Sequence, residues 1–243
     1  MTRRARWLML MVILGSGCSQ ADPEGGVLVF GGTGQLGAEI VGRLVAGGEA
    51  VTVFVRPTSD RSRLAGMAVE YSVGDMLNET DVASAFQARR YRAVINAVRA
   101  PITDIPFYDL TSQYVAAHAS AAGVQQIIHH GAVGAGDNRA EFPEVPWERV
   151  PGLAARMDDH GAAERNFRAS GISTVVIRNS RVWPDGTPSS GKAALSEDHT
   201  LMTPITRVDL AEFTLQCLDN PACANKIFHA VDATLTWPPP GRE

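Results

Sequence analysis

The chain has 243 residues, a net charge of −4 at pH 7 and 45% apolar residues. This length accommodates one large domain or two small ones, and the apolar share is enough for a buried core. A slightly negative chain without a concentrated basic segment does not suit a general nucleic-acid-binding protein.

Residues 1–25 are expected to be a signal peptide and a short polar tether rather than part of the fold. Three arginines in residues 1–6 precede an apolar stretch at 7–14 that is too short to span a bilayer. Small residues before Cys18 resemble a bacterial lipoprotein processing site, and residues 2–4 resemble a twin-arginine signal. We therefore expect an exported protein, either periplasmic or anchored to the membrane only through a lipid on Cys18. Two alternatives stay open, which are plain signal-peptidase cleavage and a cytoplasmic protein whose start codon is placed too early.

A glycine-rich turn at residues 31–37, with the sequence GGTGQLG, follows an apolar run at 27–30. It opens a segment whose apolar residues recur every three to four positions, which predicts a helix. In such a strand–turn–helix unit, Gly31 permits the tight turn and Gly34 lets the backbone approach a pyrophosphate. Gly37 lets the helix lie close to the strand. The spacing therefore predicts a dinucleotide site.

The second expected strand, at residues 50–55, ends at Arg56, with Arg61 and Arg63 close behind and no acid at the strand tip. An acid at this place binds the ribose of NAD, whereas an arginine accommodates the 2′-phosphate of NADP. We therefore favour NADP(H) as the cofactor. The alternative is that these arginines belong to an ordinary solvated basic loop.

Apolar strands continue to alternate with amphipathic helices along the chain. Further strands are expected at 69–73, 93–98, 126–130, 172–178 and 226–230, and further helices at 78–86, 110–122, 158–169 and 208–218. This order predicts an α/β fold, a Rossmann-type doubly wound parallel sheet in a single domain at 26–243. Two long irregular stretches, 131–151 and 179–202, are expected to be binding loops.

Two residue pairs raise other possibilities. Cys217 and Cys223 could form a disulfide across the intervening turn, although two free thiols are the favoured interpretation. The adjacent His129 and His130 lie on an expected strand, where neighbouring side chains point to opposite faces. They cannot easily share an ion, so no metal site is expected.

Three groups of residues together resemble a known family. They are residues 31–37 with 53–56, residues 73–76, and the segments 158–160, 170–172 and 205–211. The chain is similar to atypical short-chain dehydrogenases/reductases of the NmrA-like NAD(P)H-binding group, and to their flavin reductase/biliverdin-IXβ reductase branch. The resemblance implies that Arg56 holds the 2′-phosphate and that Asp75 and Met76 meet the adenine. It also implies a pyrophosphate site at Gly31, Thr33, Gly34, Gln35 and Leu36, and a nicotinamide site at Asn96, Ala97 and Val98.

The chain departs from the wider superfamily at the catalytic positions. Arg156 and His160 match the usual Tyr-x-x-x-Lys pair, and Gly131 or Ala132 matches the usual serine. His160 is the catalytic candidate because the similar branch has a histidine there, and a surface or helix-cap role is the alternative. We expect an NADPH-dependent reductase that passes hydride to a flavin, quinone or similar conjugated acceptor, which needs less from a general acid. The alternative is an NmrA-like sensor that binds NADP(H) without turnover. The sequence leaves the oligomeric state open.

Overall fold

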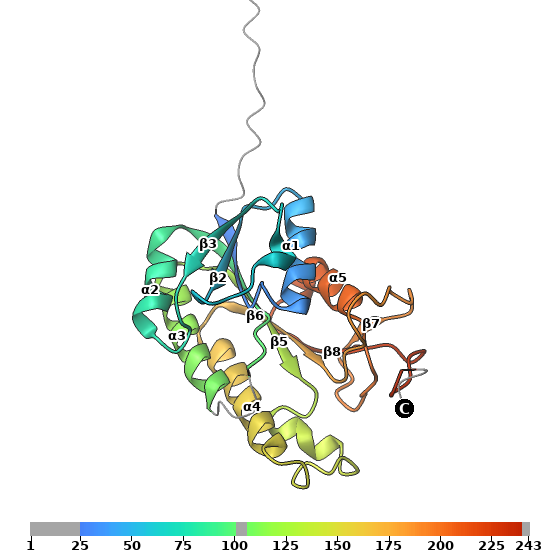
Figure 1. The fold of residues 1–243 in the computed structure, drawn as a ribbon. Coiled ribbons are helices and arrows are strands. Elements are labelled where there is room, and N and C mark those ends of the chain that lie inside the picture. The colour runs from blue at the N-terminus through green and yellow to red at the C-terminus, as the bar shows by residue number, and fades with distance from the viewer. Residues whose placement is uncertain (1–24, 101–105, 240–243) are drawn as a thin grey trace, which may run out of the picture.

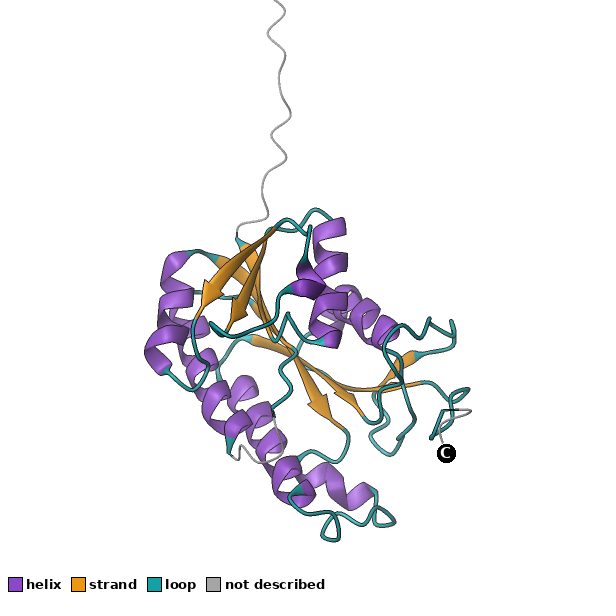
Figure 2. Ribbon diagram, viewed as in Figure 1, coloured by secondary structure: helices purple, strands orange, loops and turns teal. Residues whose placement is uncertain are grey.

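An eight-stranded sheet forms the centre of the molecule (Figures 1 and 2). The computed structural model describes residues 25–100 and 106–239. In chain order, the strands are β1 (Gly26–Phe30), β2 (Val51–Val55), β3 (Val69–Val73), β4 (Tyr91–Asn96), β5 (Gln126–Ala132), β6 (Ser173–Asn179), β7 (Ala194–Ser196) and β8 (Ile227–Val231). Their order across the sheet is β3-β2-β1-β4-β5-β6-β8-β7. All neighbours pair in parallel except the short edge strand β7, so the predicted doubly wound sheet is confirmed.

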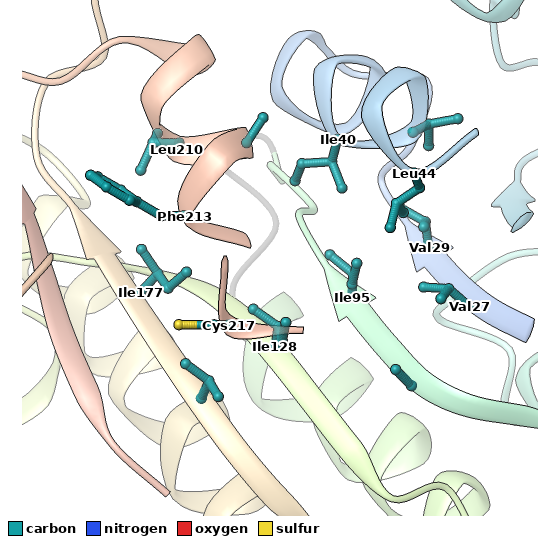
Figure 3. Close-up of a cluster of buried hydrophobic side chains, with 14 of the residues drawn as sticks. Val27, Val29, Ile40, Leu44, Ile95, Ile128, Ile177, Leu210, Phe213 and Cys217 are labelled. Carbon is teal, nitrogen blue, oxygen red and sulfur yellow. The ribbon is translucent and has the colours of Figure 1, made fainter. Parts of the chain in front are cut away.

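Helices cover both faces of this sheet. One face carries α1 (Gln35–Ala46) and α5 (Arg207–Cys217), which pack against each other and bury the cluster shown in Figure 3. The other face carries α2 (Glu79–Ala88), α3 (Phe107–Ala121) and α4 (Leu153–Ala169). Short 3₁₀ turns are η1 (Ser62–Leu64), η2 (Gly136–Glu141) and η3 (Pro221–Cys223).

Strand β1 shows why the strand segments are continuously apolar. Val27 and Val29 pack in the cluster beneath α1 and α5, whereas Leu28 and Phe30 pack in the cluster beneath α2, α3 and α4. A parallel strand covered on both faces has no solvent side, so polar residues do not alternate with apolar ones.

The strand order reverses beside β1, because β2 lies on one side of it and β4 on the other. Ligands of open α/β sheets bind in the crevice at such a switch point, outside the carboxyl ends of the strands. Residues 31–37 follow β1 at this point, and residues 97–100 follow β4. The fold therefore places the glycine turn and the loop after β4 side by side.

Two helices begin earlier than the sequence predicts. Helix α3 begins at Phe107 rather than at residue 110, and α4 begins at Leu153 rather than at residue 158. The carboxylate of Asp159 on α4 accepts hydrogen bonds from the backbone N–H groups of Tyr108 and Asp109, at 2.9 and 2.7 Å. These contacts satisfy donors that the first turn of α3 leaves unpaired, and local sequence cannot reveal a capping residue about 50 positions away.

Cys217 and Cys223 form a disulfide, so the favoured expectation of two free thiols is wrong. The end of α5 and the turn η3 bring the two Cα atoms to 5.4 Å, within the range that a disulfide requires. Within the described parts of the chain, no helix combines the length and the apolar character needed to cross a membrane. The expected leader, including Cys18, lies outside the described residues.

Candidate functional site

Two glycines of the turn, Gly31 and Gly37, are required by the fold itself. Gly31 has a φ of +79°, and a Cβ there would lie 2.6 Å from the carbonyl oxygen of Ala97. A Cβ on Gly37 would lie 2.1 Å from the carbonyl oxygen of Gly31. Both overlaps are with backbone atoms that cannot move aside, so these glycines are required with or without a ligand.

Gly34 is less constrained than Gly31 and Gly37, because a Cβ there would make a tight contact but no severe overlap with the described residues. Its φ of −73° and ψ of 171° are open to any residue. Among the described residues, a Cβ would come close only to the Gly31 oxygen, at 3.2 Å, a contact that needs a shift of a few tenths of an ångström. It is exposed at the N-terminus of α1, where the first N–H groups have no intrahelical partner and no acid stands in the first turn. The remaining predicted pyrophosphate residues, Thr33, Gln35 and Leu36, are partly exposed around it. The open backbone and the positive end of the helix fit a phosphate group.

The predicted nicotinamide residues lie directly beside this turn. The N–H of Ala97 donates to the oxygen of Phe30 at 3.0 Å, which ties the loop after β4 to the end of β1. Asn96 is buried, and its side-chain oxygen accepts a hydrogen bond from the N–H of Val98 at 3.4 Å. The structure thus brings together two groups that the sequence separates by about 60 residues.

The expected adenosine end of the site contains three arginines in different environments. Arg56 is exposed at the end of β2 and has no ion-pair partner within residues 25–100 and 106–239. Arg61 lies over the ring of Tyr71 at 4.5 Å, and Arg63 forms an ion pair with Asp185 at 2.8 Å. Arg56 is therefore the arginine best placed to meet a phosphate without losing another contact.

The two residues expected at the adenine differ in exposure. Asp75 is exposed at the end of β3, where a carboxylate could reach a ligand. The side chain of Met76 is buried in the core cluster that includes Phe30 and Phe54. Only the backbone of Met76 remains for contact with an adenine.

His160 is buried between α3 and α4. Its ring stacks on Tyr108 with centroids 3.9 Å apart, and burial, reinforced by the charge of Arg156, lowers its pKa to about 3. Arg156 itself donates to the oxygen of Ala100 at 2.6 Å and lies 3.3 Å from the hydroxyl of Tyr108. His160 is therefore neutral at pH 7. Sequence reasoning missed Tyr108, since no motif links it to residues on α4.

His129 and His130 point to opposite faces of the sheet, as predicted. His129 packs against Phe167, and its Nδ1 lies 3.4 Å from the side-chain nitrogen of Asn96. His130 contacts the hydroxyl of Thr214 on α5 through Nε2, at 2.9 Å, and burial lowers its pKa to about 4. In the described ranges, no three side chains of His, Cys, Asp or Glu gather as a metal site would require.

A buried ion pair, which the sequence did not indicate, lies next to Gly131 near the end of β5. Glu164 on α4 accepts from Arg178 on β6 at 2.6 Å, and both side chains are about 95% buried. A Cβ on Gly131 would lie 2.7 Å from Oε1 of Glu164. A cavity of about 590 Å³ opens beside the pair, and it is lined by none of the glycine-turn residues or residues 96–98.

Comparisons with known proteins agree with this geometry. A family model described as NAD(P)H-binding matches residues 31–221. ChuY, an anaerobillin reductase from Escherichia coli O157:H7, has a TM-score of 0.74 at 20% identity, covering 86% of this chain and 98% of ChuY. A wide-type short-chain dehydrogenase/reductase from Veillonella parvula, in complex with NADP, has a TM-score of 0.69 at 11% identity, covering 88% and 98%.

A curated relative matches a shorter part of the chain. Sterol demethylase protein B of Methylococcus capsulatus is 32% identical over 115 residues, which are 44% of this chain. The match spans about a third of the relative's length, 34%. The structural neighbours, at these identities, support the fold, and the family match confirms the predicted NAD(P)H-binding group.

Proposed function

Because this chain belongs to the NAD(P)H-binding family, we propose that it is an NADPH-dependent reductase that passes hydride to a flavin, quinone or similar conjugated acceptor. The observation that carries the proposal is the glycine turn at the switch point of the sheet. Gly34 is exposed, and packing constrains it less than Gly31 or Gly37, because a Cβ there would approach the Gly31 oxygen to only 3.2 Å. The space in front of this turn supports binding of a phosphate.

Different residues of the site bind different parts of the dinucleotide. The backbone N–H groups of Gln35 and Leu36, at the start of α1, face the pyrophosphate, because the N–H of Gly34 donates to the oxygen of Gly31 at 3.0 Å. Arg56 pairs with the 2′-phosphate that distinguishes NADP(H) from NAD(H). Asn96, Ala97 and Val98 hold the nicotinamide side. When bound, NADPH supplies the hydride, and the chain orients the cofactor and keeps water away from it.

The proton that accompanies hydride transfer favours a conjugated acceptor. His160 is neutral at pH 7, so it can take part in hydrogen bonds but cannot act as an imidazolium acid. An acceptor that delocalises the new negative charge can be protonated by solvent after the hydride has been transferred. The buried ring of His160 also favours the alternative function, a sensor that binds NADP(H) without turnover.

Oxidation of NADPH by the purified full chain tests the proposal, with a panel of flavins and quinones as acceptors. Anaerobillin belongs in the panel because ChuY is named for it. We expect turnover with at least one acceptor and none in the Gly34→Val variant. Tight NADPH binding without turnover on any acceptor would favour the sensor, and absence of binding would contradict both functions.

A further inference from the structure

An ion pair joins two loops that leave distant strands of the sheet. Arg63 follows β2 and Asp185 follows β6, 122 positions later, and their charged groups lie 2.8 Å apart. Three strands, β1, β4 and β5, separate β2 from β6 in the sheet. The pair therefore reaches across the part of the molecule where the glycine turn leaves β1.

The two residues of the pair belong to segments that lie on opposite flanks of α1. Arg63 belongs to η1, which packs against α1. The loop with Asp185 is attached to the start of α5, since Arg207 donates to the oxygen of Trp183 and the N–H of Trp183 donates to Ile205. Helix α5 packs against α1 as well. The ion pair thus links the two flanks of the helix whose N-terminus is the proposed pyrophosphate site.

Further cations lie within electrostatic range. Burial lowers the pKa of Arg207, Asp185 opposes this shift, and the charges of Arg99 and Arg63 add to it. Arg99 follows β4 and the proposed nicotinamide residues. The loops after β2, β4 and β6 and the start of α5 therefore hold three arginines and one carboxylate within electrostatic range of one another. The excess positive charge suits an anionic ligand.

The carboxylate of Asp185 pairs with Arg63, one of the three arginines expected near the 2′-phosphate of NADP(H). A carboxylate and a phosphate use the same guanidinium donors. Arg63 and Asp185 are partly exposed, at 45% and 36%, so the pair is screened by water and can exchange its anion. Arg56, in contrast, has no such competitor among the described residues.

We propose that Asp185 is a specificity-determining residue, which holds Arg63 in the free protein and yields it to the 2′-phosphate of NADP(H). This inference rests on the proposed function, because it assumes that a dinucleotide binds at the glycine turn. Asp185 then weakens NADP(H) binding and leaves NAD(H), which has no 2′-phosphate, almost unaffected.

Dissociation constants for NADPH and NADH, measured by titration calorimetry on the full chain, test this. Loss of an exposed ion pair of this kind corresponds to a change of about two- to fivefold in the dissociation constant. We expect Asp185→Asn to tighten NADPH binding by that factor, with NADH unchanged at about 0.15 M salt, where distant charges are screened. Arg63→Ala should weaken NADPH selectively, and adding Asp185→Asn to it should then have no effect.

Two further variants serve as controls. Asp185→Glu keeps the charge and should bind both dinucleotides as the wild type does. Glu197→Gln removes an exposed acid that pairs with Lys226 near the opposite edge of the sheet, and it should change neither constant.

Three outcomes would overturn the inference. Equal tightening of both dinucleotides by Asp185→Asn would indicate a general charge effect, and equal weakening would indicate a clamp over any bound dinucleotide. No change for NADPH in either single variant would show that Arg63 does not meet the 2′-phosphate. If no variant and no wild-type protein bound either dinucleotide, the proposed function itself would fail, which is a distinct result.

Discussion

Substituting valine for Gly34 is expected to abolish NADP(H) binding while the chain stays folded. The backbone at Gly34 is extended, and the new Cβ would meet one atom, the Gly31 oxygen at 3.2 Å. We therefore expect the free energy of unfolding to change by no more than about 1 kcal/mol. For a chain of this size, that is a shift in Tm of up to about 4 °C. The side chain would stand in the ligand's place and remove at least one charge-assisted hydrogen bond. The loss of that one bond alone is about 1.5–3 kcal/mol, or about 10- to 150-fold in affinity, so this is the smallest effect expected.

Thermal unfolding with and without NADPH measures both effects in one assay. Wild-type protein at a hundred times its Kd should gain about 2.7 kcal/mol, or about 5–11 °C in Tm. At the same NADPH concentration, the valine variant should gain no more than about 1.4 kcal/mol, the value for a tenfold loss of affinity. Gly37→Ala is the matched control, because its Cβ would overlap the Gly31 oxygen at 2.1 Å. That variant should lose about 1–3 kcal/mol without any ligand. A valine variant that keeps the NADPH shift would refute the assigned phosphate position, and one that melts like the Gly37 variant would refute the claim that the fold tolerates a side chain there.

Four further predictions concern other parts of the molecule. Arg56→Glu should weaken NADPH by about 1.5–3 kcal/mol in calorimetric titration and NADH far less, and equal losses would contradict the cofactor assignment. Cys217→Ala should lower the free energy of unfolding by about 2 kcal/mol, because the disulfide closes a short loop; reductant should do the same to wild type and nothing more to the variant. Because burial lowers the pKa of His160 from 6.5 to about 3, stability should be full above pH 6.5 and fall as the pH drops towards 3. The loss should reach about 2 kcal/mol at pH 5 in urea titrations, and His160→Phe should remove that share. Protein taken from the cell envelope should carry NADP(H) through dialysis, and changing Arg3 and Arg4 to Lys should block export; cofactor-free envelope protein with unchanged export would contradict this.

The parts of the fold that could be predicted depend on residues close together in sequence. The apolar run of β1, the glycines at 31, 34 and 37, and the periodicity of α1 each lie within a few positions, so their pattern predicts the unit directly. The rule that ligands bind at the carboxyl ends of parallel strands then placed Asn96 beside Gly31 without knowledge of any contact.

The features that could not be predicted are pairs of residues far apart in sequence. Asp159 caps α3, Arg178 reaches Glu164 from another element, and Asp185 reaches Arg63. No local pattern marks such partners, because a charged residue at any one of these positions would, by itself, be read as an ordinary solvent-exposed side chain. The same limit applies to His160, whose helix was predicted but whose burial depends on a ring from α3.

The contact between Gly131 and Glu164 has a consequence for how this chain could change over evolutionary time. If Gly131 is the position of the superfamily's serine, a hydroxymethyl group there would collide with Oε1 of Glu164, which a Cβ would already approach to 2.7 Å. Shortening Glu164 first would leave the buried guanidinium of Arg178 without its counter-ion, a loss of about 3–5 kcal/mol in comparable cases. Each single step therefore carries a cost through the same ion pair, so regaining the serine depends on a coupled adjustment of Glu164 and Arg178.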